Sequence, residues 1–319
     1  MHEDTNIAIQ REVVKYMTPI GLLMNAIFLY VVARIKSMHS IVNIYLGNLA
    51  AADTVILASS LVSLLWQTRS IWRDLILVSL ANVSTFASHF FVTALAFERY
   101  FAICRPLTFR AEAGKGRAFK ITAGLWVTAI VVGFAVTAAF VWGGDAGSNA
   151  TNVVTMVHYT VGLVINVYLY VCIVKKLRQQ PKITSSDDHQ QRLRRVILML
   201  IVNTAVFFAL NITSIIEAIM VAIIAWSSLS YSSLVKLNHS WIDLVIVVFI
   251  LGLFNSSVNP LVYSGVNSDY REALVEAFSF LNPKRYCCRN RDTTQRPAQQ
   301  IEMQEIKPRH GRAAAGNEV

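Results

Sequence analysis

The residue best placed to do chemistry in this sequence is Asp53, a carboxylate inside the long apolar stretch of residues 41–66. An ionisable group at mid-membrane costs about 2.5–3.5 kcal/mol even on the lenient insertion scale, and such groups are functional by default. Amides and hydroxyls stand at similar depth in other apolar stretches, and they are Asn25, Ser88, Asn255, Ser256 and Asn259. One carboxylate with neutral oxygens suits a hard cation and water rather than zinc. The residues alone also allow a carboxyl group that is tolerated because it faces other helices.

A second charged feature is the pair Glu98 and Arg99, which follows the apolar stretch 75–97. Opposite charges attract more strongly at the edge of a membrane than at a wet surface, because the dielectric constant is lower there. Releasing Arg99 toward a partner would create a two-state element. The alternative is an interfacial arginine that extends its charge into the water.

Membrane-crossing helices are needed to position these side chains. The sequence is 55% hydrophobic and only 15% charged, whereas a soluble domain is about one quarter charged. A helix of about 20 apolar residues crosses the hydrocarbon core. Seven stretches fit this length, namely 13–33, 41–66, 75–97, 121–142, 153–174, 196–226 and 241–266. The sequence therefore predicts an all-α membrane protein, a seven-transmembrane helical bundle formed by residues 13–266.

The flanking segments differ in character. Residues 1–12 are short and polar and are expected to be an extracellular N-terminus. Residues 267–282 carry apolar side chains at helical spacing, which predicts an amphipathic helix on the membrane surface. Residues 283–319 are polar and predict a disordered cytoplasmic tail.

The net charge of +10 indicates topology rather than nucleic-acid binding. Lys and Arg concentrate in the connections 98–120 and 175–195 and in the tail, all on one side of the predicted membrane. The positive-inside rule then places the N-terminus outside and the C-terminus in the cytoplasm of a multi-pass cell-membrane protein. Contact with anionic membrane lipids is a secondary role for the basic residues.

Short motifs recur along the whole chain, each at a matching membrane depth. They are Asn25, the stretch from Asn48 to Asp53, Glu98-Arg99-Tyr100, Trp126, Asn259-Pro260-Leu261-Val262-Tyr263 and Asp269-Tyr270-Arg271. Any one of them is a weak signal. Together and in this order, they make the chain resemble the rhodopsin-like (class A) G-protein-coupled receptor family from end to end.

This resemblance implies roles for two groups of residues. The family's allosteric sodium ion, the one cofactor expected, would be held by Asp53, Ser88, Asn255, Ser256 and Asn259. The switch that couples to a heterotrimeric G protein would consist of Glu98, Arg99, Tyr100, Tyr170, Asn259, Pro260 and Tyr263. Glu98 would hold Arg99 at rest, and Arg99 would face the G protein after the sixth span swings outward.

The chain also departs from the family pattern. Asp74 occupies the position of a disulfide cysteine, and the predicted loop 143–152 has no cysteine. Gly162 replaces the proline of the fifth span, and residues 210–213 replace the Cys-Trp-x-Pro stretch of the sixth. We therefore expect a straighter sixth helix with altered activation. Since no acidic residue near Arg194 could latch Arg99, we also expect raised basal signalling.

The ligand is weakly specified. Ala81 stands where amine receptors carry Asp, and Leu253 stands where opsins carry the retinal lysine. Both classes are thus disfavoured, and a lipid, a peptide or another small molecule remains. By position, the pocket is expected to be lined by Ala81, Asn82, Thr85, His158, Asn211, Ser214, Ile215, Ala218, Phe249 and Leu253.

Two modifications are predicted outside the spans. Asn149 opens a glycosylation sequon in an expected extracellular loop. Cys287 and Cys288 follow the surface helix beside basic residues and are predicted to be palmitoylated.

The sequence thus predicts a receptor, not an enzyme, that transduces binding of an extracellular ligand into G-protein activation. It contains no HExxH pair and no nucleophile–histidine constellation. One alternative is a receptor-fold protein that either does not signal or is constitutively active. A transporter that uses the polar residues around Asp53 as a path is the less favoured alternative.

Overall fold

Helices are the only secondary structure in the described part of the chain. The structure is a computed structural model, and it describes residues 2–66, 68, 70–107, 109, 114–179, 198, 201–202, 204–212, 215–216, 219 and 231–279, with the side chains of 2–7, 145, 148–149, 231–245 and 266 excepted. One compact unit is formed by Met1–Ala277, and the description below concerns that unit.

Six described helices are long and apolar enough to cross a membrane, in agreement with the predicted helical bundle. In chain order the elements are α1 (His2–Arg34), η1 (Lys36–Met38), α2 (Ile41–Leu65), α3 (Ile71–Cys104), α5 (Lys115–Trp142), α6 (Gly144–Gln179), α8 (Tyr231–Val266) and α9 (Ser268–Ala277). The predicted sixth span, 196–226, lies largely outside the described residues. Its described part includes a helical stretch at 204–212.

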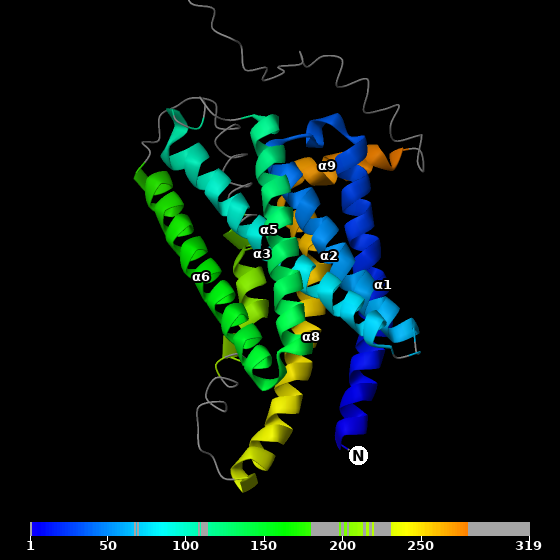
Figure 1. The fold of residues 1–319 in the computed structure, drawn as a ribbon. Helices are drawn as coiled ribbons and strands as arrows, with labels where there is room; N and C mark the ends of the chain where they lie inside the picture. Colours follow the sequence, from blue (N-terminus) through cyan, green and yellow to red (C-terminus); the bar gives the residue numbers. More distant parts are fainter. Residues whose placement is uncertain are drawn as a thin grey trace, which may run out of the picture. The chain divides into compact units, whose positions relative to one another are not determined.

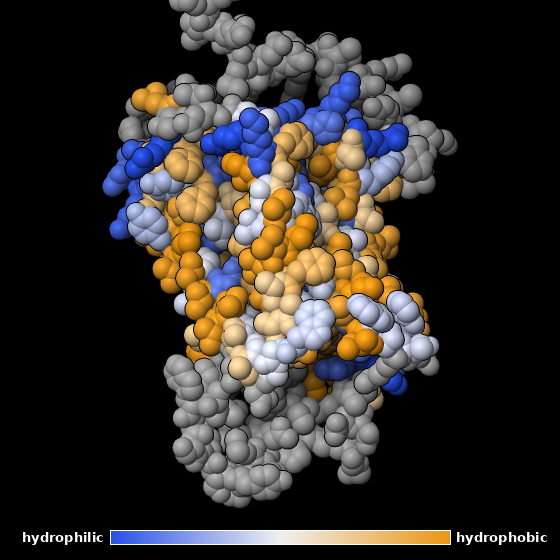
Figure 2. Space-filling model, in the orientation of Figure 1, coloured by the Kyte–Doolittle hydropathy of each residue, from blue (hydrophilic) through white to orange (hydrophobic). Residues whose placement is uncertain are grey.

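α3 is the central helix of this unit. It packs against α2, α5 and α6, while α1 packs against α2 and α8 (Figure 1). The outward faces remain apolar, as Val127, Val131 and Phe134 on α5 illustrate. Figure 2 shows such side chains as a broad hydrophobic band across the helices. An apolar surface of this extent suits contact with lipid tails rather than with water.

The two ends of the helices differ in charge. At one end, here called the α9 end, α1 finishes, α5 begins and α9 lies across the bundle (Figure 1). Hydrophilic side chains gather there in Figure 2, and the exposed basic residues include Arg34, Lys36, Lys115, Lys120, Lys175, Lys176 and Arg178. The opposite end, where α2 finishes at Leu65 and α3 starts at Ile71, is here called the Arg73 end.

Asn267 separates α8 from α9 and caps the start of α9. Its Oδ1 accepts a hydrogen bond from the backbone N–H of Asp269 at 3.0 Å, as an N-cap residue does. The Arg271 Nη1 donates to the carbonyl oxygens of Ser264 and Gly265, each at 3.0 Å, which satisfies the end of α8. The predicted surface helix therefore forms, and it is shorter than 267–282 because it ends at Ala277.

One face of α9 is anchored to the bundle. Tyr270, Ala273 and Ala277 are buried, and the Tyr270 ring lies 5.3 Å from that of Phe28 in α1. Burial raises the pKa of Tyr270 to about 12, so its hydroxyl stays protonated.

Two segments outside the predicted spans are helical. α1 begins at His2, because residues 2–12 contain no Gly or Pro and include good helix formers. The loop expected at 143–152 is wrong, since α5 ends at Trp142 and α6 begins at Gly144. Gly144 adopts φ 55°, which glycine tolerates without strain. The connection between α5 and α6 is therefore a tight turn.

Candidate functional site

Asp53 joins three helices in the interior of the bundle. The residue belongs to α2 and has no exposed surface. Its carboxylate accepts hydrogen bonds from Ser88 Oγ of α3 at 2.9 Å and from Asn259 Nδ2 of α8 at 2.7 Å. Hydrogen bonds to a charged group are the strong ones, so any displacement of α3 or α8 at this depth must break or remake them.

A cavity of about 140 Å³ lies beside Asp53. Ser88, Asn255 and Ser256 also line it, and the Asn255 Oδ1 is buried without a hydrogen-bond partner among the described residues. An unpaired carbonyl oxygen next to a carboxylate can be satisfied by a hard cation, which prefers oxygen ligands. The residues present therefore fit a sodium ion, for which Asp53 would supply the counter-charge.

Other motif residues connect neighbouring helices at similar depth. Asn25 Nδ2 of α1 donates to the carbonyl oxygens of Ser256 in α8 at 2.9 Å and of Gly21 at 3.0 Å. Trp126 Nε1 of α5 donates to Asn48 Oδ1 of α2 at 2.9 Å. The short polar motifs of the sequence are thus contact points between helices, and together they hold the frame around Asp53.

The ion pair at the α9 end differs from the expected one. Glu98 is buried, and its Oε2 accepts from Arg117 Nη2 of α5 at 2.9 Å. Arg99 forms no ion pair with Glu98 in this structure, and its buried Nε has no hydrogen-bond partner among the described residues. Arg117 reaches Glu98 from the neighbouring helix and occupies its Oε2 instead.

The remaining switch residues lie toward the same end. The Tyr170 hydroxyl of α6 forms a hydrogen bond of 2.9 Å with Thr204 Oγ1 of the sixth predicted span. Tyr263 of α8 is buried, and its ring lies 5.0 Å from that of Phe28. Pro260 is buried within α8, and Tyr100 packs beside the buried residues of α3 and α6.

The ten predicted ligand-pocket residues do not line one pocket. Thr85 and Asn211 line the small cavity beside Asp53. Ala81 and Phe249 line a larger cavity at the Arg73 end. Asn82 instead points to α5, where its Nδ2 donates to Thr137 Oγ1 at 3.0 Å.

Other members of that set are also dispersed or lie outside the described residues. His158 lines an apolar groove between α3, α5 and α6. Leu253 is buried in a hydrophobic cluster with Val14 and Leu57, and Ile215 is half-buried. Two members of the set, Ser214 and Ala218, lie outside the described residues. The same holds for the predicted modification sites Cys287 and Cys288 and for the side chain of Asn149. The backbone of residue 149 lies within α6 and not in the loop expected for the sequon.

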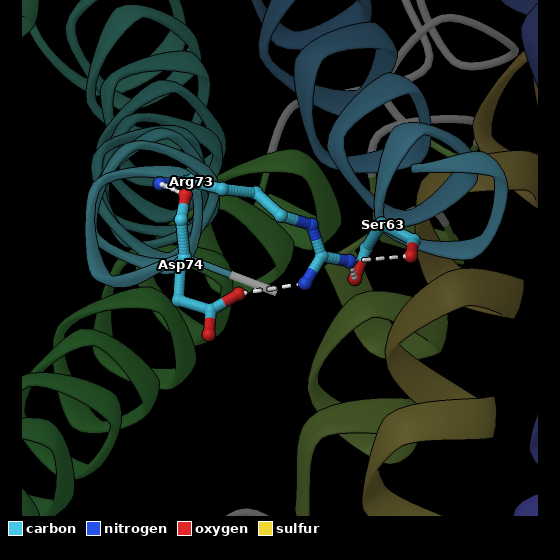
Figure 3. A network of polar contacts seen from close by, with 4 residues as sticks. Ser63, Arg73 and Asp74 are labelled. Atoms are coloured by element: carbon cyan, nitrogen blue, oxygen red, sulfur yellow. Dashed lines mark hydrogen bonds and ion pairs between the residues drawn. The ribbon is translucent and has the colours of Figure 1, made fainter. Parts of the chain in front are cut away.

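Arg73, near the start of α3, was missed by the sequence reasoning. It is 7% exposed, and its Nη1 bonds to Asp74 Oδ1 at 2.8 Å (Figure 3). Its Nη2 donates to Ser63 at the end of α2, with 2.6 Å to the carbonyl oxygen and 3.3 Å to Oγ. A charged residue just before the predicted span 75–97 was the available signal, but position alone did not show that Arg73 turns inward.

A pair of histidines is the other feature that the sequence did not reveal. The rings of His89 in α3 and His158 in α6 lie 4.9 Å apart, and Phe86, Tyr159 and Phe207 surround them. His89 is buried, and neither of its ring nitrogens has a hydrogen-bond partner among the described residues. The long separation of the two residues in sequence hides that α3 and α6 pack together.

Comparison with known proteins agrees with this arrangement. Residues 24–145 match the family described as 7 transmembrane receptor (rhodopsin family). The chain is 24% identical to somatostatin receptor type 1 of Rattus norvegicus over 283 residues, which is 80% of this chain and 67% of the relative. It is 34% identical to growth hormone secretagogue receptor type 1 of Mustela putorius furo over 117 residues, 34% of this chain and 32% of that one.

Proposed function

Because the chain belongs to the rhodopsin family of seven-transmembrane receptors, we propose that it converts binding of an extracellular ligand into activation of a heterotrimeric G protein. The family consists of multi-pass membrane receptors and not of enzymes. The observation that carries the proposal is the bonding of Asp53 to both Ser88 and Asn259. This network joins α2, α3 and α8. A ligand that moves these helices at one end would therefore also move their opposite ends, at the proposed G-protein surface.

The α9 end is proposed to be cytoplasmic and the Arg73 end extracellular. Most exposed lysines and arginines of α1, α5 and α6 support this orientation, because they lie at the α9 end and basic residues favour the cytoplasmic side. The same surface, which includes Arg99 near the end of α3, is the proposed contact for the G protein.

We propose that motion along α3 couples the two ends. Ser88 and Arg99 share this helix and are about 16 Å apart at 1.5 Å per residue. A shift of α3 that breaks the Ser88–Asp53 bond therefore also repositions Arg99. The Tyr170–Thr204 bond supports a linked motion of α6 and the sixth span, and an outward movement of the sixth span would expose Arg99.

A peptide is the ligand class that we favour, since the relatives are named as receptors for somatostatin, a peptide, and for a growth hormone secretagogue. The lipid and other small-molecule classes are less favoured on this ground. The cavity at the Arg73 end, about 800 Å³, is within the size range of ligand sites.

A basal signalling assay tests this function without a known ligand. The natural chain would be expressed with each class of G protein, and nucleotide exchange would be compared with that of Arg99→Ala. We expect exchange above mock-transfected cells for at least one class, and its loss in Arg99→Ala at equal surface expression. Exchange that is indistinguishable from mock cells for every class would favour a receptor-fold protein that does not signal.

Constitutive activity is a second candidate, favoured by one specific observation. Glu98 bonds to Arg117 at 2.9 Å instead of to Arg99, so the resting latch expected within this motif is not formed. Repeating the assay with an agonist, once one is identified, separates the two candidates, because a constitutively active receptor would show high exchange that the agonist raises little.

A further inference from the structure

The strongest unassigned feature is the cavity at the Arg73 end. About 800 Å³ in volume, it lies between α1, α2, α3 and α8. Its lining combines polar residues, among them Gln10, Arg11 and Ser63, with apolar residues, among them Val14 and Phe249. Such a cavity suits an amphipathic ligand with a polar group at one point and apolar groups elsewhere.

Arg73 is the polar group of the cavity whose charge and hydrogen-bond donors are least completely satisfied. Its side chain is only 7% exposed, whereas that of its partner Asp74 is 55% exposed. Water screens the exposed carboxylate, so Asp74 neutralises the buried guanidinium only in part. The Arg73 Nε is also buried and has no hydrogen-bond partner among the described residues. A buried arginine with an unused donor has a strong preference for an additional anion.

The charge balance of the cavity points the same way. Its described ionisable residues are Arg11, Arg73 and Asp74, two positive and one negative. Arg11 is exposed and forms no ion pair with a described residue, so the entrance is positive. Planar guanidinium groups bind carboxylates through paired hydrogen bonds, which a cation or a neutral ligand would leave unused.

We infer that this cavity binds the C-terminal carboxylate of an extracellular peptide whose last residues are apolar. The carboxylate would lie against Arg73, the serines of α2 would meet the peptide backbone, and the apolar side chains would lie toward Val14 and Phe249. The position at the end of the helices, next to exposed Arg11 and Asp74, favours a ligand arriving from water over a membrane lipid. This inference rests on the proposed receptor function and names its ligand class.

Purified receptor in lipid nanodiscs would be incubated with two combinatorial octapeptide libraries. The libraries would be identical except that one has free C-terminal carboxylates and the other C-terminal amides. Retained peptides would be quantified by mass spectrometry. We expect free-acid peptides with apolar ends to be retained at least about tenfold better than their amides, as for a lost partner of a buried charge. Equal retention of acids and amides, or retention of neither, would overturn the inference.

Variants connect the result to Arg73. Arg73→Met should abolish the preference for free acids. Lys15→Met is the matched control, because it removes an exposed positive charge of α1 that does not line the cavity. Thermal unfolding of each variant reports its folding. If Arg73→Met does not fold, Arg73→Lys keeps the charge but not the Nε donor, and it should lose most of the preference. A preference that survives in either folded Arg73 variant would contradict the inference.

A final arm separates a peptide from a lipid. Decanoate, a simple fatty carboxylate, should displace the retained peptides only weakly. Displacement by decanoate as effective as that by the peptides themselves would assign the cavity to lipid carboxylates and overturn the peptide assignment. None of these measurements requires a G protein, so the inference can fail while nucleotide exchange still supports the receptor function.

Discussion

The contacts in one half of the bundle could be predicted from the sequence, and those in the other half could not. Around Asp53 and toward the α9 end, polar residues recognised in the sequence contact one another across helices, as in the Ser88–Asp53 and Trp126–Asn48 bonds. Toward the Arg73 end, the residues expected to surround a ligand are divided between separate cavities. Burying a polar group requires a partner, so a polar residue inside a span predicts a contact. An apolar residue at the same depth carries no such information.

The largest expected effect breaks the inner network. Asp53→Ala should lower the free energy of unfolding by about 3 kcal/mol, because Ser88 and Asn259 lose their acceptor and each buried unsatisfied group costs about 1–3 kcal/mol. Thermal unfolding would be measured in sodium chloride and in choline chloride. The natural chain should be more stable in sodium, and the variant should show no difference.

Thr54→Val is the control for this change, because Thr54 Oγ1 bonds only within its own helix, to the carbonyl oxygen of Ala50 at 2.7 Å. If sodium still stabilised Asp53→Ala, the result would show that the ion does not bind in this cavity.

The next effect concerns close packing in the outer half. A Cβ atom on Gly133 of α5 would lie 2.7 Å from backbone atoms of Val83 in α3. Gly133→Leu should therefore destabilise the bundle by about 1–3 kcal/mol through overpacking. Gly124→Leu on the same helix has open space around it and should be nearly neutral in thermal unfolding. Equal effects would show that α3 and α5 are not in close contact in the folded protein.

A smaller effect tests the latch at the α9 end. Arg117→Gln should free Glu98 to pair with Arg99 and lower basal nucleotide exchange by about fivefold, a value at the low end of coupling energies. Lys120→Gln removes the same charge from an exposed position of α5 and should leave exchange unchanged. If nucleotide exchange rose in Arg117→Gln, the result would show instead that Arg117 stabilises the resting state.

The smallest effect tests which of the predicted ligand-pocket residues actually contact the ligand. Asn82→Ala removes one bond, to Thr137, and should cost about 0.6 kcal/mol, a typical value for such bonds between membrane helices. Because Asn82 faces α5, peptide retention should not change. Ala81→Phe fills the neighbouring cavity and should reduce retention. If Asn82→Ala lost peptide retention, the result would show that Asn82 belongs to the ligand site.

Much of the fold was predictable because long apolar stretches and buried polar residues carry strong physical signals. The spans, the surface helix and the grouping of Asp53 with Ser88 and Asn259 followed from these. Side-chain direction did not: the sequence cannot show that Arg117 reaches Glu98, or that Arg73 turns inward to Ser63. The stretch 144–152 was misread for a related reason, since it is hydrophilic and yet helical. Polarity reports exposure to water rather than backbone conformation.

The tight turn at Gly143 and Gly144 has a consequence for production and handling. A connection this short offers no long segment that a disulfide could fasten to α3, and the four cysteines of the chain, Cys104, Cys172, Cys287 and Cys288, all fall elsewhere in the sequence. Noncovalent contacts such as that between Arg73 and Ser63 hold the described outer helices together instead. The receptor should therefore mature without an oxidising compartment and keep its melting temperature in dithiothreitol.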